Sequence, residues 1–565
     1  MGKRILIVGG VAGGASVAAR ARRIDAQAEI IMFEKGPHVS FSNCSLPYYL
    51  SGTVADSDAL IMMSPEKFKK SYDIDARVNQ EVTAIHREKK TIEVKDISTG
   101  TIKEEPYDFL VLAPGAAPIR PKSIKGADRP DVYTIRNVVD IIHLKDGVAS
   151  DEIRDVAVIG GGFIGIETAE NLRKLGKQVT VIEAMDQILA PLDYDMVQMV
   201  QKEMMDHGVQ VIVGDGVKEI DGSQVLLASG RMVPAQAVVL AIGVAPETSL
   251  ARQAGLEIGE TGGIKVDHNY RTSDENIYAV GDAIEVFDRL TQKPGRLALA
   301  GPALRQARAA ADSMYGMPCA NRGVIGSCAI RVFDLNIAAT GLNEKTARKA
   351  QIPYDFAYVI PSDKVGIMPQ SAPMHFKLLF QVPTGKILGA QAIGKGNVDK
   401  RVDVAAALIA MNGTVEDLKE LELCYSPVFA TARDVVNQAG LVASNLLNGY
   451  YRQVPVSKVR QLVEEKAFIV DVREENEYKA GHLINAVNIP LSQLRERIDE
   501  IPRDRPVYVH CRSGQRSYNA VMALQGRGYR NVWNISGSFL GICLYEYYTD
   551  VTGNREKIVT EYNFK

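Results

Sequence analysis

The chain has 565 residues, of which 46% are apolar and 24% are charged, an ordinary composition for several globular domains. Its formal net charge of −2 gives no overall positive field, so neither nucleic acid nor a membrane is expected as a partner. Six scattered cysteines without a CxxC pair exclude a disulfide-rich secreted fold and disfavour a metal site. No apolar stretch could span a bilayer, and we expect a cytoplasmic location.

Strand-like apolar runs alternate with helical patterns as far as about Cys328. This alternation is typical of α/β domains, in which helices cover parallel sheets. The expected strands are Arg4–Val8, Glu29–Phe33, Phe109–Ala113, Val156–Ile159, Gln178–Ile182 and Ala237–Ala241.

A glycine-rich turn follows the first strand and precedes a helix predicted over Ala15–Arg23. Gly9 and Gly14 occupy the first and third glycine positions of a G-x-G-x-x-G pattern, but Val11 replaces the second. Such a turn presents the N-terminus of a helix to a pyrophosphate, and Glu34, at the end of the next strand, could accept ribose hydroxyls. If this motif is considered alone, the alternative is a strand-to-helix turn that binds no ligand.

A second glycine turn matches the full pattern with Gly160, Gly162 and Gly165, and a helix is expected from Ile166. Glu183 ends the following strand and is followed by no arginine. A carboxylate there accepts a hydrogen bond from a ribose 2′-hydroxyl and repels a 2′-phosphate. The motif therefore favours NADH, with NADPH still possible.

A third motif, over residues 272–282, ends in Gly281-Asp282. Together with the two turns, it resembles the FAD/NAD-linked pyridine nucleotide-disulfide reductases over roughly residues 1–445. The resemblance implies that Asp282 bonds the ribityl chain of FAD. It also implies two Rossmann-like domains, for FAD (residues 1–118 and 251–328) and for NAD(P)H (residues 119–250).

The pattern changes after Val332, where strands at His375–Leu379 and Ile387–Ile393 precede a helical run at Val402–Met411. This order predicts an α+β unit, which the family uses as a dimerisation domain, here residues 329–449. The resemblance implies a homodimer or a higher homo-oligomer. A short linker over Tyr450–Val456 leads to a further compact α/β segment, residues 455–565.

One cysteine, Cys44, lies in the stretch Ser-Phe-Ser-Asn-Cys. By itself a lone cysteine is usually a buried, inert residue. The stretch resembles the single-cysteine branch of the family, which contains coenzyme A disulfide reductases, persulfide reductases, NADH peroxidases and NADH oxidases. A lone cysteine beside a flavin must form a mixed disulfide with a substrate or a sulfenic acid with peroxide.

Residue 12 helps to choose within this branch. The peroxidases and oxidases have a histidine in the turn where this chain has Ala12, which weakens the peroxidase and oxidase interpretation. Gly-Gly-Val-Ala-Gly-Gly at this turn resembles the coenzyme A reductases. Coenzyme A would then be a substrate moiety or a bound ligand, and cations near this turn would hold its phosphates. The alternative is that these cations only form a solvated basic face. The candidate contacts are Arg20, Arg23, Ser40, Asn43 and Lys70.

Tyr425 lies in a Tyr-Ser-Pro-Val stretch that resembles a family motif from the dimerisation domain. The resemblance implies that this phenol reaches the active site of the opposite subunit, where it could protonate a leaving thiolate. A second tyrosine-bearing segment of the family corresponds to residues 366–370, which read Gly-Ile-Met-Pro-Gln. The missing tyrosines argue against efficient reduction of coenzyme A disulfide.

The C-terminal segment contains Asp471 and Arg473 after a strand at Phe468–Val470, and Cys511 after a strand at Val507–Val509. These stretches resemble rhodanese domains. A cysteine between a strand and a helix receives backbone N–H groups and the helix dipole, which lower its pKa and stabilise a persulfide. Asp471 and Arg473 are interpreted as supports of the loop. The loop residues after the cysteine are Arg512, Ser513, Gly514, Gln515 and Arg516.

Cysteine phosphatases share this loop geometry, and an inactive rhodanese is a further alternative. The short loop resembles sulfurtransferases, and the two arginines could add positive potential. The combination predicts an NADH-dependent flavoprotein that reduces coenzyme A persulfide and related persulfides or polysulfides through Cys44 and Cys511. The alternatives are a coenzyme A disulfide reductase with an accessory rhodanese, a peroxidase or oxidase, and a stand-alone sulfurtransferase.

Overall fold

The computed structural model describes residues 2–319 and 321–564. The chain divides into two compact units. One consists of residues up to Asp186 together with Ile212–Val324, and the other of Gln187–Val211 together with the chain from Ile325 onward.

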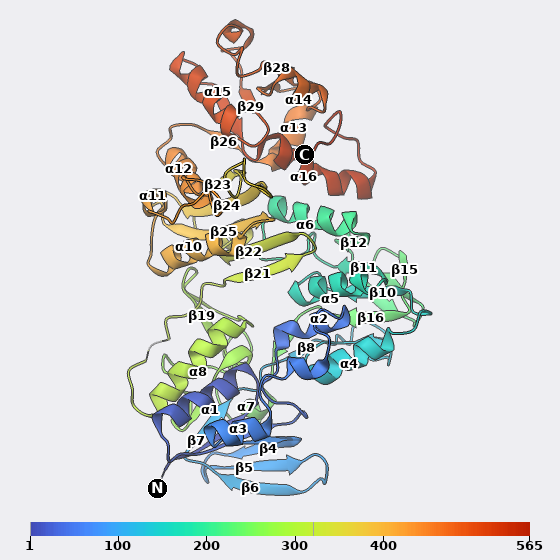
Figure 1. Cartoon of the computed structure of the whole chain (residues 1–565), viewed down its shortest axis with the longest axis vertical. Coiled ribbons are helices and arrows are strands. Elements are labelled where there is room, and N and C mark those ends of the chain that lie inside the picture. Colours follow the sequence, from blue (N-terminus) through green and yellow to red (C-terminus); the bar gives the residue numbers. More distant parts are fainter. Residues whose placement is uncertain (1, 320, 565) are drawn as a thin grey trace. The chain divides into compact units, whose positions relative to one another are not determined.

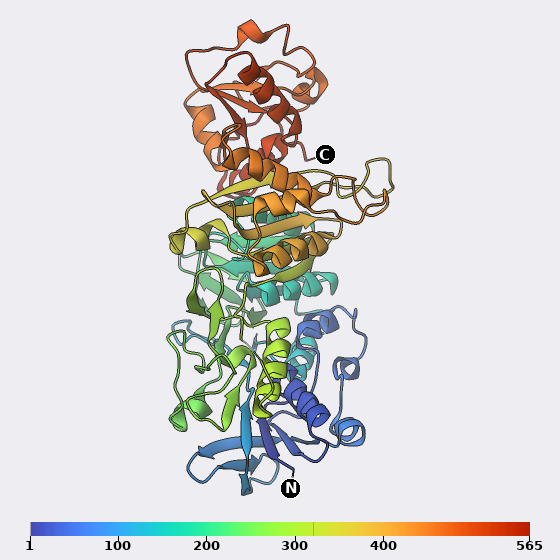
Figure 2. The same ribbon diagram turned by 90° about the vertical axis from the view of Figure 1, so that its left-hand side faces the viewer.

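The first unit contains a five-stranded parallel sheet in the order β18-β7-β1-β2-β3. Its strands are β18 (Ile277–Ala279), β7 (Phe109–Leu112), β1 (Arg4–Val8), β2 (Glu29–Glu34) and β3 (Asp75–Val78). Ile5, Leu6 and Ile7 are fully buried, as expected for a central strand covered on both faces. Helices α1 (Ala12–Ile24) and α8 (Ala300–Met314) lie side by side in Figure 1 and Figure 2.

A second parallel sheet in this unit has the order β11-β10-β16-β9. Its strands are β11 (Gln178–Glu183), β10 (Asp155–Ile159), β16 (Ala237–Leu240) and β9 (Val132–Tyr133). The strands predicted for both sheets are confirmed to within one residue at each end. Four smaller antiparallel sheets that the periodicity did not indicate also lie in the described part of this unit. Two have three strands each: β4 (Gln80–His86), β5 (Thr91–Asp96) and β6 (Ile102–Pro106), and β13 (Val217–Ile220), β14 (Gln224–Leu227) and β15 (Met232–Pro234). Two have two strands each: β8 (Ala116–Pro118) with β17 (Val244–Pro246), and β19 (Val286–Asp288) with β20 (Lys293–Gly295).

Helix α5 (Phe163–Lys174) follows β10 and begins three residues before the predicted Ile166. Gly162 is its N-cap, so the last glycine of the motif, Gly165, lies inside the first turn. A Cβ atom at Gly165 would lie 2.0 Å from the Gly160 carbonyl oxygen. The glycine therefore permits close packing of helix against strand, which is why a motif glycine can sit inside a helix.

The second unit contains an antiparallel sheet in the order β21-β22-β25-β24-β23, and helices pack against it, which confirms the predicted α+β arrangement. The strands are β21 (Cys328–Val332), β22 (Leu335–Gly341), β25 (Ile387–Gly394), β24 (Met374–Gln381) and β23 (Tyr354–Val359). The helices are α9 (Glu344–Lys349), α10 (Val398–Ala410), α11 (Val415–Glu420) and α12 (Val435–Leu447). Helix α10 begins four residues before the predicted Val402, and Asp399 in its first turn favours that earlier start.

The C-terminal segment forms a parallel sheet in the order β26-β30-β29-β27-β28. Its elements are β26 (Gln453–Val454), α13 (Val459–Glu464), β27 (Phe468–Asp471), α14 (Glu475–Lys479), β28 (Val487–Asn488), β29 (Val507–His510), α15 (Gln515–Gly526), β30 (Val532–Ile535) and α16 (Ser538–Gly553). The predicted linker over residues 450–456 is therefore partly a strand. Gln453 and Val454 pair with β30, and two residues are too few for any period to reveal a strand.

Helix α16 lies beside α6 (Tyr194–Asp206) within the second unit (Figure 1). The Tyr548 hydroxyl donates to the Val211 carbonyl at 3.0 Å, and the rings of Tyr194 and Tyr545 meet edge to face at 5.5 Å between centroids. Among the described residues, no helix is both long enough and apolar enough to cross a membrane.

A buried lysine joins α6 to the antiparallel sheet. The Lys377 ammonium lies 3.1 Å from a carboxylate oxygen of Asp193, 2.8 Å from Asp195 and 2.5 Å from Glu344. Lys377 is 1% exposed. Burial opposes its charge, but the surrounding carboxylates raise the pKa of Lys377 well above its usual value. The three acids could otherwise serve as metal ligands, and the ammonium fills the space between them.

We predict that K377M leaves these carboxylates buried without their cation and lowers the free energy of unfolding by about 3–5 kcal/mol. Urea denaturation at neutral pH measures the loss. The control is K395M, since Lys395 pairs with Asp334 at an exposed position and its removal should cost less than about 1 kcal/mol. Equal effects of the two variants would contradict the prediction.

Candidate functional site

The first glycine turn requires glycine at both predicted positions. Gly9 has a φ of +96°, and a Cβ atom there would lie 2.1 Å from the Ala113 carbonyl oxygen. A Cβ atom at Gly14 would lie 1.8 Å from the Gly9 carbonyl oxygen. Glu34 accepts hydrogen bonds from the backbone N–H of Gly10 at 3.0 Å and of Gly36 at 2.9 Å. The carboxylate is thereby fixed at the strand end and keeps lone pairs for further donors.

The second turn repeats this arrangement. Gly160 has a φ of +111°, and no atom lies within 4 Å of a Cβ built on Gly162, so the backbone is open to a ligand there. Glu183 accepts from the N–H of Gly161 at 2.7 Å and of Met185 at 2.8 Å. In both turns a positive-φ glycine is followed by a glutamate that accepts backbone N–H groups, and both arrangements suit a dinucleotide.

Asp282 lies in a short 3₁₀ turn, Gly281–Ala283, that follows β18. Burial raises the pKa of its carboxyl above the usual range, and no hydrogen bond or positive charge among the described residues offsets this effect. A desolvated carboxyl without a compensating protein group suits a position whose hydrogen-bond donor is a ligand. The donor set at these three places fits the FAD and nicotinamide cofactors that the sequence resemblance implies.

Cys44 lies in a 3₁₀ turn, Asn43–Ser45, which leads directly into helix α2 (Leu46–Leu50). Its side chain is exposed to solvent. The thiol is still partly buried, and this burial is the main cause that raises the pKa of Cys44. The negative charges of Glu167 and Asp282 raise it further. The thiol is thus accessible, and protein carboxylates from two other parts of the unit act on it.

Sequence reasoning did not identify Glu167 or its partner Tyr48. The Tyr48 hydroxyl donates to Glu167 at 3.1 Å, which connects the helix after Cys44 to α5. The available signal was the position of Glu167, two residues after the last glycine of the second turn.

A surface cavity of about 370 Å³ brings together three of the five residues proposed for coenzyme A, namely Arg20, Arg23 and Ser40. Arg308 also lines it and was not predicted. Arg20 is paired with Asp312 at 2.6 Å, which reduces the charge that it can offer. The remaining two candidates, Asn43 and Lys70, are exposed and are not among the residues that line the cavity.

Tyr425 lies in the segment that precedes α12 in the second unit and is half exposed. Val428 and Phe429 of the same segment are exposed as well, the latter by 71%. Large apolar side chains exposed together are typical of surfaces that contact another chain. The predicted role of Tyr425 across a subunit interface stays a prediction.

Cys511 directly follows β29 and is 1% exposed. The backbone N–H of Gly514, which has a φ of +108°, donates to the Cys511 sulfur at 3.1 Å. Ser538, not identified from the sequence, accepts from the Cys511 N–H at 3.2 Å, and its hydroxyl lies 3.9 Å from the sulfur. Ser538 is left-handed, with a φ of +50°, at the start of α16. The sulfur therefore faces a backbone donor and a hydroxyl.

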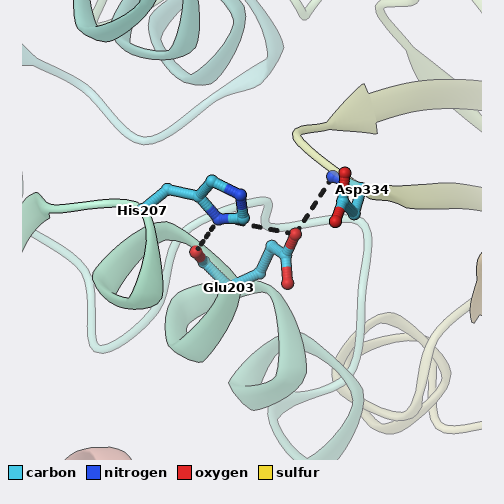
Figure 3. Close-up of side chains that lie close together, drawn as sticks. All are labelled: Glu203, His207 and Asp334. Carbon is cyan, nitrogen blue, oxygen red and sulfur yellow. Dashed lines mark hydrogen bonds and ion pairs between the residues drawn. The ribbon is translucent and has the colours of Figure 1, made fainter.

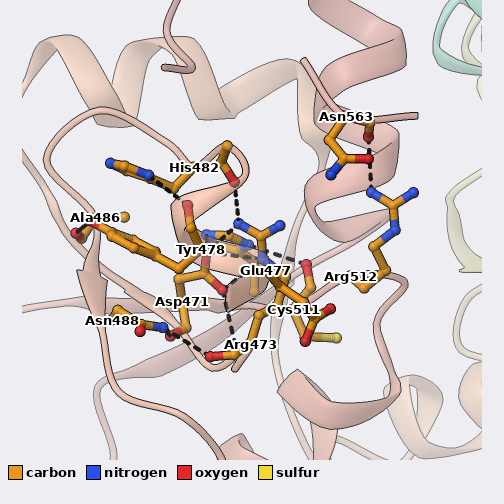
Figure 4. Close-up of polar contacts among 12 residues, drawn as sticks. Asp471, Arg473, Glu477, Tyr478, His482, Ala486, Asn488, Cys511, Arg512 and Asn563 are labelled. Atoms are coloured by element: carbon orange, nitrogen blue, oxygen red, sulfur yellow. Dashed lines mark hydrogen bonds and ion pairs between the residues drawn. The ribbon is translucent and has the colours of Figure 1, made fainter. Parts of the chain in front are cut away.

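Both arginines of the Cys511 loop have partners. In Figure 4 the Arg512 guanidinium points to the Asn563 carbonyl, to which it donates at 2.9 Å. Arg516 forms a two-pronged ion pair with Glu477, at 2.6 and 2.7 Å. The positive potential that the sequence suggested is thus partly neutralised. Of the other loop residues, Ser513 is half-buried and Gln515 is exposed.

A buried ion pair between Arg473 and Asp471 lies next to this loop. Arg473 donates to Asp471 at 2.6 Å, as Figure 4 shows. It also donates to the Gly481 carbonyl at 2.7 Å. Burial opposes ionisation of Asp471, but His510 and Arg473 hold the pKa of its carboxyl below the usual range. Both members of the pair are buried against other protein groups, in agreement with a supporting role.

A further cluster on the second unit consists of Glu203, His207 and Asp334 (Figure 3). The Asp334 N–H donates to the Glu203 carboxylate at 3.0 Å, and His207 hydrogen-bonds the Glu203 carbonyl at 2.9 Å. The His207 ring stacks on Phe333 at 4.1 Å. The donor types could hold a metal ion, but these contacts already connect α6 to the β21–β22 hairpin.

Comparison with known proteins identifies three matched regions. Residues 3–307 match the pyridine nucleotide-disulphide oxidoreductase family, residues 328–435 match its dimerisation domain, and residues 456–544 match a rhodanese-like domain. A coenzyme A disulfide reductase from Staphylococcus epidermidis is 31% identical over 441 residues, which cover 78% of this chain and 99% of that protein.

Two solved structures are similar over almost the whole chain. The crystal structure of reduced CoADR-RHD from Bacillus anthracis has a TM-score of 0.94 and 42% identity, covering 97% of this chain and 99% of the other. An NAD-dependent persulfide reductase from A. fulgidus has a TM-score of 0.91 and 34% identity, covering 95% and 99% respectively.

We predict that E477Q strengthens the positive potential at Cys511 by releasing Arg516 from its ion pair. The rate at which the dianion thiosulfate loads Cys511 with sulfur, measured as thiocyanate formed with cyanide, should rise about threefold at low ionic strength. The gain should disappear in high salt, which screens such an effect. The control is E475Q on the same helix, an exposed residue paired with Lys479. A gain that persists in high salt would contradict this explanation.

Proposed function

Because the chain belongs to the FAD-linked pyridine nucleotide-disulphide oxidoreductase family and carries a rhodanese-like domain, we propose that it reduces coenzyme A persulfide and related small persulfides with NADH. The products are sulfide and a thiol. The reductase class follows from the family, whereas the persulfide substrate is the proposal.

The observation that carries this proposal is the surroundings of Cys511. A buried cysteine whose sulfur accepts a backbone N–H and faces a hydroxyl suits an anionic outer sulfur atom. The persulfide reductase named above, which matches over both units of this chain, supports the same substrate class. Phosphoester chemistry is disfavoured, because Arg516 is already paired with Glu477.

FAD would be held by the first glycine turn, Glu34 and Asp282, and NADH by the second turn and Glu183. When bound, FAD passes two electrons from the nicotinamide to a disulfide. The protein's own part is to place one thiol, Cys44, at the end of this path. Because no second cysteine occurs beside it, Cys44 must form a mixed disulfide with the substrate thiol.

In the proposed relay, Cys511 receives or presents the outer sulfur of the persulfide. The carrier thiol then holds that sulfur as a persulfide, R–S–SH; the Cys44 thiolate attacks its inner sulfur, the S–S bond breaks, and the outer sulfur leaves as sulfide. Two electrons cleave the resulting disulfide, which frees the thiol and restores the Cys44 thiolate. The cavity lined by Arg20, Arg23 and Arg308 supplies cations for the phosphates of coenzyme A.

Reduction of coenzyme A disulfide is the second candidate, favoured by the 31%-identical relative of that name. Against it stands the segment over residues 366–370, where Ile367, 84% exposed, and its neighbours provide no phenol. Ala12 disfavours a peroxidase, since no imidazole is offered at that turn. The match to the dimerisation domain supports a homodimer in which Tyr425 serves the partner subunit.

We predict that C44S reduces NADH-dependent sulfide release from coenzyme A persulfide by more than about 1000-fold, since it removes the nucleophile. C511S should impair the same reaction and leave NADH reduction of the flavin unchanged. Anaerobic NADH oxidation with parallel sulfide measurement tests both variants.

Coenzyme A disulfide is the control substrate. If it turns over faster than the persulfide and is indifferent to C511S, the chain is a coenzyme A disulfide reductase with an accessory rhodanese. Sulfide release by C44S at the wild-type rate would exclude the relay.

We predict that NADH is preferred because the Glu183 carboxylate, fixed at the end of β11, would accept a hydrogen bond from a ribose 2′-hydroxyl and repel a 2′-phosphate. The double variant E183A/A184R should shift the ratio of kcat/KM for NADPH over NADH by about tenfold or more, since tenfold corresponds to only ~1.4 kcal/mol. Steady-state kinetics with both nucleotides measures the ratio, and A184R is the control. An unchanged ratio in the double variant would contradict the assignment.

A further inference from the structure

The first residues of α16 hold the backbone of the Cys511 loop. The N–H of Phe539 donates to the Cys511 carbonyl at 3.0 Å, and the N–H of Leu540 donates to the Arg512 carbonyl at 3.1 Å. The Ser538 hydroxyl accepts from the Cys511 N–H at 3.2 Å. These bonds fix the Ser538 oxygen 3.9 Å from the Cys511 sulfur, in a place where both side chains are buried.

The proton of the Ser538 hydroxyl has no close acceptor among the described residues. The Ile535 carbonyl and the Ser517 oxygen both lie at 3.4 Å, and the Cys511 sulfur lies at 3.9 Å. Ser517 uses its own proton for the Gly514 carbonyl, at 3.0 Å. A hydrogen bond to an ion is about twice as strong as one between neutral groups. A negatively charged sulfur at Cys511 is therefore the strongest acceptor within reach of this proton.

The backbone at Ser538 is left-handed, with a φ of +50°, as is that of Gly537 before it, with a φ of +76°. Glycine adopts this conformation freely, whereas a residue with a Cβ atom adopts it at a cost in free energy. A strained residue beside a reactive sulfur is a reason to look for a role of its side chain.

Tyr358, on β23 of the antiparallel sheet, packs against the start of α16. A Cβ atom at Gly537 would lie 2.8 Å from the Tyr358 ring, and one at Gly541, a turn further along, would lie 3.6 Å from it. The Tyr358 hydroxyl lies 2.7 Å from Nδ1 of His375. Burial is the main cause that lowers the pKa of His375 to about 4, so the neutral ring can accept from this hydroxyl. The ring that supports the residue before Ser538 is thus itself held in the sheet.

We infer that Ser538 is a catalytic residue of sulfur transfer, whose hydroxyl donates to the sulfur of Cys511 while it is a thiolate and to the persulfide formed from it. Tyr358 is a positioning residue that holds the start of α16, so the antiparallel-sheet domain completes the site of the rhodanese-like domain. This inference rests on the sulfur-transferring role of Cys511 in the proposed function and names two residues on which that role depends.

Both steps of sulfur transfer from thiosulfate to cyanide keep one negative charge at Cys511. In the first step the Cys511 thiolate attacks the outer sulfur of thiosulfate, the S–S bond breaks, and its electron pair leaves with sulfite. In the second step cyanide attacks the outer sulfur of the Cys511 persulfide. The S–S bond breaks, thiocyanate leaves, and the electron pair restores the Cys511 thiolate. No proton is transferred in either step, so one fixed donor can serve both.

The test compares two variants that both lack the hydroxyl in the full-length, FAD-loaded enzyme. S538A keeps a Cβ atom at the left-handed position, whereas S538G relieves that strain and should be the more stable of the two in urea. We expect kcat/KM for thiosulfate, measured as thiocyanate formed with cyanide, to fall at least about tenfold in both. The control is T552A, which removes an exposed hydroxyl from the same helix and should react like wild type.

The role of Tyr358 is tested by a double-mutant cycle. Y358L withdraws the ring from Gly537 and should lower the transfer rate about threefold or more, whereas Y358F keeps the ring and should restore it. If Tyr358 acts through Ser538, Y358L should cause no further loss in an S538G background. An equal loss in both backgrounds would show that Tyr358 does not position this hydroxyl.

Wild-type transfer rates in S538A and S538G would overturn the inference. A loss confined to the less stable S538A would overturn it as well, since strain and not the hydroxyl would then be the cause. It would also fail if wild type loaded no sulfur onto Cys511 from thiosulfate or from coenzyme A persulfide. If wild type transfers sulfur normally but releases no sulfide from coenzyme A persulfide with NADH, the proposed function fails and the role of Ser538 stands.

Discussion

The geometry of the molecule depends on one constraint: a parallel strand that passes into a helix must leave backbone N–H groups at the helix start without partners in that helix. This chain places such a turn after β1, β10 and β29. At the first two, glycines leave the backbone open to a phosphate, and a carboxylate bonded to the turn is held where it could accept from a ribose. At the third, the Gly514 N–H donates to the Cys511 sulfur. In the proposed function, the same local structure would thus serve two cofactors and one reactive sulfur.

This constraint explains what could be predicted from the sequence. Central parallel strands are continuous apolar runs, and glycine is the residue that tolerates the φ and the contacts of such turns, so both features are visible in the residue order. The strand Arg4–Val8 and the strand Phe468–Val470, which in the structure extends to Asp471, were therefore predicted from the sequence, as were the strand-end positions of Glu34, Glu183 and Cys511. The α+β character of the middle segment was predictable from a different signal, the change of pattern after Val332 in which strand-like runs precede a helical run.

Features formed by residues far apart in the chain were not predictable. Tyr48 and Glu167 are separated by 119 positions, and neither has a distinctive local pattern. The same holds for Ser538, which reaches the Cys511 loop from the start of α16, and for Lys377 among its three carboxylates. Arg516 shows the opposite case, a charge that is visible in the sequence although its partner is not. The sequence predicts a positive site there, but Glu477 pairs with Arg516 in the structure. A sequence displays charges, but only packing reveals which of them are already compensated.

The strand in the linker limits how the rhodanese-like domain can move during the proposed sulfur transfer. Gln453 and Val454 pair with β30, and the Gln453 side chain donates to the Phe356 carbonyl at 2.7 Å, so the connection is part of two folded domains and not a loose tether. The Tyr358 ring also packs where any side chain at Gly537 would collide with it. The rhodanese-like domain is therefore held against the antiparallel-sheet domain by backbone and side-chain contacts, and it does not swing on a free linker. In the proposed relay, the reach of the sulfur would then depend on the length of the small molecule that carries it and not on motion of this domain about its linker.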